Sequence, residues 1–99
     1  MSSPRSLSLR LFVAGGSPES AIAIANLQAL FPDDERSTVE IEIVDVESDP
    51  ARAARDGIVV TPTLLKLSPS PPCRILGNLR NGPALRELLG LERGPAGRS

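Results

Sequence analysis

The side chains that most often perform chemistry are scarce in this chain of 99 residues. It contains one cysteine, Cys73, one lysine, Lys66, and no histidine. Without histidine, a histidine-ligated zinc site and a histidine general base are both excluded within one chain. Cys73 has only Arg74 as a neighbouring cation, which favours a small buried side chain over a reactive thiol. The residue types therefore argue against an enzyme and against a metal centre.

A glycine-rich turn, Gly15-Gly16-Ser17-Pro18, follows the first apolar run. Free backbone N–H groups at a helix N-terminus attract anions, so the turn could cradle a phosphate. It lacks the lysine and the spacing of a P-loop, and it is too short for a dinucleotide fingerprint. A tight turn that uses the conformational freedom of glycine needs no ligand. We therefore expect structural roles for Gly15 and Pro18, and no cofactor.

The run Thr61-Pro62-Thr63 enters a second apolar stretch. Its structural interpretation is a cis-proline that bends the chain into a strand. Its functional interpretation is a substrate platform beside a reactive thiol, but no thiol stands at the 15–18 turn. Lys66 also has two interpretations, a contact with an acidic partner or the solvated side of a strand. The sequence does not decide between these two interpretations of Lys66.

The charge balance excludes two classes of partner. Eleven basic and twelve acidic residues leave a net charge of −1, which gives no general attraction to nucleic acid or to a membrane surface. Two phenylalanines without tryptophan or tyrosine leave little for bases to stack on. No apolar run approaches the roughly 20 residues that cross a bilayer, and residues 1–6 lead into a strand pattern, not into a signal core. We expect a cytoplasmic protein.

Periodicity predicts the elements of the N-terminal half. Apolar residues alternate over 7–13, as in a strand with one apolar face. Ser17 suits an N-cap and Pro18 the first helical position, which predicts a helix over 18–30. A second alternating run over 39–46 carries glutamates on its other side, as suits an edge strand.

The C-terminal half reads in the same way. Pro50 starts a short helix that Gly57 stops. Strands are expected over 64–67 and 73–77, separated by a proline-rich connection. Pro83 starts a helix of strong helix formers over 84–89.

The order β-α-β-α-β-β-α is typical of a thioredoxin-like α/β fold, a mixed four-stranded sheet with three helices. The glycine-rich turn stands where redox members of that fold carry their cysteine pair. One domain is expected over 7–91, with flexible termini at 1–6 and 92–99.

At this level of detail the sequence resembles the KaiB family of clock proteins. The shared motifs cover about residues 7–91: Leu9-Arg10-Leu11-Phe12-Val13-Ala14-Gly15, Ser17-Pro18, Val44-Asp45-Val46, Asp49-Pro50, Asp56, Thr61-Pro62-Thr63-Leu64, Lys66, the prolines ending at Pro72, and Arg74-Ile75-Leu76-Gly77-Asn78-Leu79. The resemblance implies a protein without catalytic activity that binds the ring ATPase KaiC and alters its phosphorylation cycle in a clock or timer. It also implies fold switching, in which the C-terminal half exchanges a tetrameric ground-state packing for a monomeric thioredoxin-like one.

The resemblance assigns roles to individual residues. Partner-binding positions are Asp56, Gly57, Lys66 and Arg74; structural or switch positions are Gly15, Pro18, Pro50, Thr61, Pro62, Thr63, Gly77 and Pro83. Residues 21–25 lack the basic side chains that clock members use to bind KaiA, so that partnership is not expected. Pro83 and the helix formers after it favour the thioredoxin-like state. The alternatives are a degenerate thioredoxin-like redox or stress-response protein that uses Cys73 or Ser17, and a partner of a histidine kinase.

Overall fold

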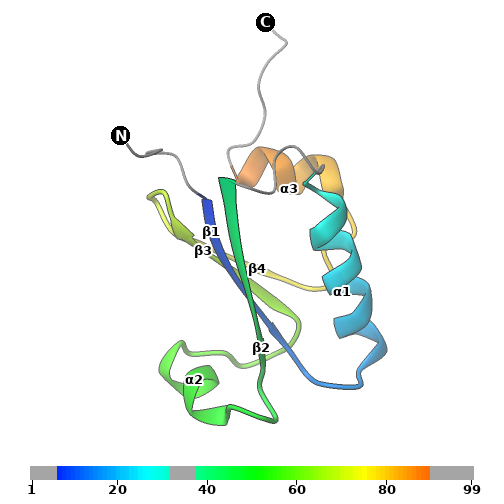
Figure 1. Ribbon diagram of the computed structural model, residues 1–99, viewed down its shortest axis with the longest axis vertical. Helices are drawn as coiled ribbons and strands as arrows, with labels where there is room; N and C mark the ends of the chain where they lie inside the picture. Colours follow the sequence, from blue (N-terminus) through cyan, green and yellow to red (C-terminus); the bar gives the residue numbers. More distant parts are fainter. Residues whose placement is uncertain (1–6, 32–37, 90–99) are drawn as a thin grey trace, which may run out of the picture.

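One of the two inner strands of the sheet, over residues 7–13, has the most regular alternation of apolar side chains. A computed structural model describes residues 7–31 and 38–89 and contains β1 (Leu7–Val13), α1 (Pro18–Ala29), β2 (Val39–Asp45), α2 (Pro50–Arg55), β3 (Thr63–Ser68), β4 (Cys73–Leu76) and α3 (Gly82–Leu88). The sheet order is β2-β1-β3-β4. β1 is parallel to β2 and antiparallel to β3, which is antiparallel to β4. The predicted thioredoxin-like order and the edge position of β2 are confirmed (Figure 1).

One face of the sheet carries the larger core, which α1 and α3 cover (Figure 1). The alternate residues of β1 that point to this face are all at most 5% exposed. Their burial removes apolar surface from water, which stabilises the fold. The buried members of this core are Leu7, Leu9, Leu11, Val13, Ala23, Leu27, Leu30, Phe31, Leu64, Leu79, Leu85 and Leu89.

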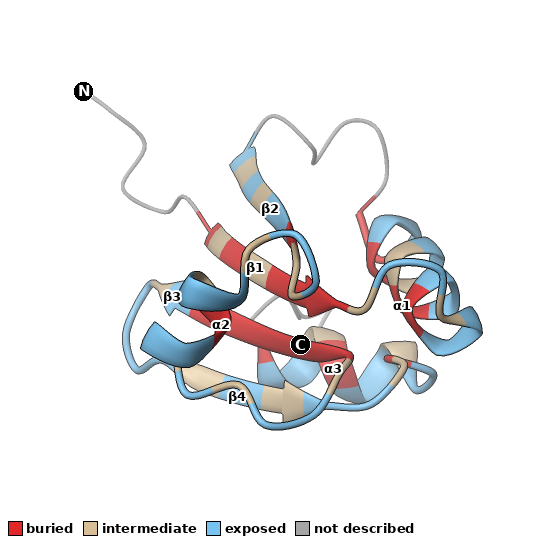
Figure 2. Ribbon diagram, turned by 90° about the horizontal axis from the view of Figure 1, so that it is seen from below, coloured by how far each residue is buried: buried red, intermediate tan, exposed pale blue. Residues whose placement is uncertain are grey.

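The opposite face carries a smaller core beneath α2. Its buried members are Phe12, Val44, Ala53 and Leu65, and Val46 and Ile58 pack against it. Phe12 shares this face with the polar residues Ser8 and Arg10 of β1, so the strand has an apolar anchor on both faces. Figure 2 shows β1 and β3 largely buried between more exposed edge strands.

All three helices begin in a similar way, with a polar cap and a proline at the first or second helical position. Ser17, Asp49 and Asn81 each accept a hydrogen bond from the backbone N–H three residues later. This arrangement satisfies a donor that a helix start leaves unpaired, and proline there sacrifices no helical hydrogen bond. The predicted helices after Ser17 and Pro50 are confirmed, and the last one begins at Gly82 because Asn81 is its cap.

The bounds differ from the prediction by a residue or two at most of the other ends. α1 ends at Ala29 with Leu30 as its C-cap, and Arg86 Nη1 of α3 donates to the Leu30 carbonyl at 2.6 Å. The Thr61-Pro62 bond is cis, as predicted. The expected flexible termini at 1–6 and 92–99 lie outside the described residues. Across 7–31 and 38–89, no helix has the length and hydropathy that spanning a bilayer demands.

Candidate docking surface

The glycine-rich turn after β1 is fixed by a carboxylate. The Gly15 N–H donates to Asp45 Oδ1 at 3.2 Å, and the Ser17 N–H donates to the Ala14 carbonyl at 3.0 Å. A Cβ on Gly15 would collide with the Asp45 carboxylate, and Gly16 has a φ of +84°. Hydrogen bonds from the backbone of Glu47, and then of Gly15, hold the pKa of Asp45 below its ordinary value. A charged carboxylate in this position disfavours a bound anion.

The structure does not bring the turn and the cysteine together. Cys73 begins β4 and pairs with Lys66 of β3, whereas the turn follows Val13 at the far end of β1. The thiol is partly buried. Among residues 7–31 and 38–89, no three metal-binding side chains gather into a possible ion site.

Lys66 is not at the surface. It is 6% exposed, because strand alternation places it on the same face as Leu64, towards the core that α1 and α3 cover. Both sequence interpretations of Lys66 assumed an exposed ammonium group. In this conformation the side chain is therefore not placed to contact a partner with the other three predicted positions.

Those three positions meet at the C-terminal end of α2. Asp56 is the C-cap of the helix, and Gly57 follows it with a φ of +69°, which suits glycine at a helix stop. Arg74 donates from Nη2 to the Asp56 carbonyl at 2.9 Å and from Nη1 to the Gly57 carbonyl at 3.2 Å. The arginine thus satisfies helix-end carbonyls, where a cation is favourable.

Four charged side chains surround the same helix end and form what we call the charge latch: Arg10, Glu42, Arg52 and Asp56. Arg10 pairs with Glu42 (Nε to Oε1, 2.8 Å) and with Asp56 (Nη1 to Oδ2, 2.9 Å). Arg52 grips both oxygens of Glu42, with Nη1 to Oε2 at 2.6 Å and Nη2 to Oε1 at 2.8 Å. The latch joins β1 and β2 to α2.

The latch strongly perturbs the pKa of the Glu42 carboxylate. Hydrogen bonds from Arg52 and then Arg10 lower the pKa of Glu42 to about 2. The same contact with Glu42 raises the pKa of Arg10. The sequence did not reveal these pairs, since Arg10 and Asp56 are 46 residues apart.

The pH dependence of stability should carry the signature of Glu42. Its folded-state pKa is depressed from 4.5 to about 2, so its ion pairs stabilise the fold above pH 4.5 and are lost as the pH falls through 2. In urea unfolding, we expect Glu42→Gln to lose less stability than wild type over that window. The effect is small because the Glu42 side chain is 44% exposed. Glu40→Gln on the same face of β2 should follow wild type, and parallel curves for wild type and Glu42→Gln would contradict the assignment.

An apolar loop leaves the latched helix end. The Ile58 N–H donates to the Ala53 carbonyl at 2.9 Å, and its side chain packs on the smaller core. The next two residues turn outward: Val59 is 89% exposed and Val60 is 50% exposed. Thr63 holds this loop by donating from Oγ1 to the Val60 carbonyl at 2.7 Å. We call Asp56, Gly57, Val59, Val60 and Arg74 the α2–β3 corner.

Pro50, Thr61, Pro62 and Gly77 lie in the elements and loops next to this corner, whereas Pro83 belongs to α3 at the opposite end of the molecule (Figure 1). Pro50 starts α2, Thr61 and Pro62 lead into β3, and the Gly77 N–H donates to the Pro62 carbonyl at 3.0 Å. Gly77 has a φ of +105°, and Pro83 lies in the first turn of α3.

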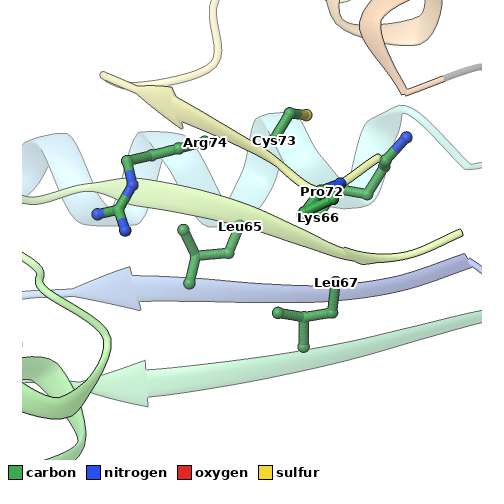
Figure 3. A pocket seen from close by; sticks show the side chains of 6 residues that line it. All are labelled: Leu65, Lys66, Leu67, Pro72, Cys73 and Arg74. Carbon is green, nitrogen blue, oxygen red and sulfur yellow. The ribbon is translucent and has the colours of Figure 1, made fainter. Parts of the chain in front are cut away.

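The sheet beside the corner is hollowed. An open cavity of about 290 Å³ is lined by Leu65, Lys66, Leu67, Pro72, Cys73 and Arg74. Strand alternation puts the side chains of Leu65 and Arg74 on the α2 face and those of Lys66 and Cys73 on the other. Figure 3 shows Arg74 directed towards the α2 end of the strands and Cys73 directed away. Arg74 is thus the residue of the lining that also belongs to the corner.

Comparisons with known proteins agree with this architecture. A family model described as the KaiB domain matches residues 10–91. The chain is 42% identical over 89 residues to circadian clock protein KaiB3 of Synechocystis sp., covering 90% of this chain and 85% of that protein. It is 36% identical over 92 residues to circadian clock oscillator protein KaiB of Prochlorococcus marinus, covering 93% and 77%.

Solved structures show the fold. The N-terminal domain of Synechococcus elongatus SasA has a TM-score of 0.71 at 21% identity, covering 95% of this chain and 92% of that one. Fasciola hepatica thioredoxin has a TM-score of 0.69 at 24% identity, covering 87% and 80%. The structural neighbours establish a thioredoxin-like fold, and the family match over 10–91 together with these identities shows that the chain belongs to the KaiB family.

Proposed function

We propose that this chain is a non-catalytic clock or timer protein that binds a KaiC-type ring ATPase and modulates its phosphorylation and ATPase cycle. The α2–β3 corner is the proposed docking surface. The observation that carries the proposal is the exposure of Val59 and Val60 in a chain of this family. Both valines lie on a firmly held loop. Exposed apolar side chains ringed by polar groups are typical of protein interfaces.

The corner has the rigidity that docking needs. Arg74 fixes the carbonyls of Asp56 and Gly57, and Thr63 fixes that of Val60. A loop already held in one conformation loses little entropy on binding. Asp56 and Arg74 are engaged within the chain, so we assign them the task of shaping the surface, and the two valines the task of contacting the partner.

The proposal includes the conformational exchange that the family resemblance implies. In it, the part from Pro50 onward, with Thr61, Pro62, Thr63, Gly77 and Pro83, adopts a second packing as a homo-oligomer, while Gly15 and Pro18 keep their places. The helix Gly82–Leu88 supports the thioredoxin-like packing as the binding-competent one. The affinity for the ATPase then scales with the fraction of chains in that packing.

A titration against a KaiC-type ATPase tests the proposed function. We expect the full chain to bind the ATPase with ATP or ADP in at least one phosphorylation state, and to change its rate of ATP hydrolysis. Analytical ultracentrifugation of the same samples reports the oligomeric state. An absence of binding across all nucleotide and phosphorylation states would contradict the proposal, as would insulin reduction at the rate of a working thioredoxin.

A further inference from the structure

We infer that α2 is held on the sheet more by the charge latch than by its own apolar burial, so that Arg10 and Glu42 are positioning residues for the α2–β3 corner. These two residues lie on β1 and β2 and outside the corner itself. The part of the inference that concerns docking rests on the proposed function. The part that concerns how α2 is held does not.

The apolar hold on α2 is slight. Ala53 is the one buried residue among the six of this helix, at 9% exposure. The methyl group of Ala53 buries little apolar surface. Burial contributes only roughly 0.8 kcal/mol per CH₂ group. A helix of six residues is also far too short to be stable by itself. Contacts with the sheet must therefore supply its stability.

The charged hold is better built than an ordinary surface pair. Glu42 uses both oxygens and accepts from two arginines, while Arg10 extends to a second carboxylate on Asp56. The side chains of Arg10, Arg52 and Asp56 are only 24%, 27% and 21% exposed. Shared, bidentate contacts of this kind are stronger than single exposed pairs, which contribute little.

The latch contacts the helix at two points, in its middle and at its C-terminal end. Arg52 lies within α2, and Asp56 is its C-cap. Loss of Glu42 removes the acceptor for Arg52 and one of the two acceptors for Arg10. The helix end would then open more often, and the loop bearing Val59 and Val60 would open with it.

Hydrogen exchange of the full chain measures this directly. The probes are the amides of Asp56, Gly57 and Ile58, whose hydrogen bonds close the end of α2 at 3.0, 3.1 and 2.9 Å. For Glu42→Gln at low salt, we expect the protection of these amides to fall about threefold to tenfold relative to wild type. Amides of β1 should keep their protection, because their hydrogen-bonding partners lie on β2 and β3 and not on α2.

Two controls separate the latch from a general loss of charge. Glu40→Gln removes a carboxylate from the same face of the same strand, and Glu40 makes no ion pair among residues 7–31 and 38–89. It should exchange like wild type. Raising NaCl to about 1 M shortens the Debye length to roughly 3 Å. Salt should therefore loosen the wild-type probes more than those of Glu42→Gln, which keeps only the Arg10–Asp56 pair.

The outcomes decide the two ideas independently. Equal protection in wild type and Glu42→Gln, or salt-independent exchange in wild type, would overturn the latch whether or not an ATPase binds. If the latch holds and the ATPase binds, Glu42→Gln should weaken binding in proportion to the loss in the fraction of chains with α2 closed, which the exchange data give, with Glu40→Gln unchanged. If the wild-type chain does not bind a KaiC-type ATPase, the proposed function is refuted, but the conclusion from hydrogen exchange is unaffected.

Discussion

Replacing Phe12 with alanine is expected to lower the free energy of unfolding by about 3–5 kcal/mol, the usual cost of truncating a buried aromatic side chain. Phe12 is 0% exposed and is the largest member of the smaller core, which has only three other buried residues. A domain of this kind has about 5–15 kcal/mol of stability in total. Urea unfolding followed by circular dichroism measures the loss.

A matched control is available on α1. Ile22 is 39% exposed, so Ile22→Ala should change the free energy of unfolding by no more than about 0.5 kcal/mol. Phe12→Leu keeps most of the apolar volume and should fall between the two. Equal effects of Phe12→Ala and Ile22→Ala would mean that the smaller core does not carry the stability assigned to it.

The second large effect concerns binding. Val59→Glu places a charge where the proposed interface buries an apolar side chain, and a central interface residue commonly contributes about 1–3 kcal/mol. We therefore expect the dissociation constant for a KaiC-type ATPase to rise about tenfold to a hundredfold. Thermal unfolding should be unchanged, since Val59 is 89% exposed in the free chain. Val59→Ser tests the loss of apolar contact without an added charge.

Leu88→Glu is the control for that experiment. Leu88 is 58% exposed on α3, which lies at the opposite end of the molecule from α2 (Figure 1). It introduces the same charge at an exposed apolar position away from the corner. If both variants weaken binding equally, the docking surface is not the α2–β3 corner.

Local signals in the sequence were enough to predict the framework. Ser17 and Pro18 marked the start of α1, and the alternation over 7–13 marked the central strand. These features depend on neighbours within a few residues. The position of the edge strand β2 followed from its glutamates, which need water or a charged partner on their side of the sheet.

The features that escaped prediction depend on residues distant in sequence. The burial of Lys66 depends on which face of β3 the helices cover. In the charge latch, Glu42 and Arg52 are 10 positions apart along the chain, and Arg10 and Asp56 are 46 positions apart. The exposure of Val59 and Val60 was not predicted either, because it depends on how the loop after α2 lies against the sheet. The family resemblance named Asp56, Gly57 and Arg74 as partner-binding positions, and the structure brings these three together at the end of α2.

The burial of Lys66 has a practical consequence for handling the protein. It is the chain's single lysine and is 6% exposed, so the native fold offers amine-directed reagents and lysine-modifying enzymes almost no side-chain target. Acetylation, amine cross-linking or dye coupling at this position should therefore be slow in this packing and faster in any packing that exposes the side chain. Chemical labelling of Lys66 is thus a built-in reporter of chains that have left this packing.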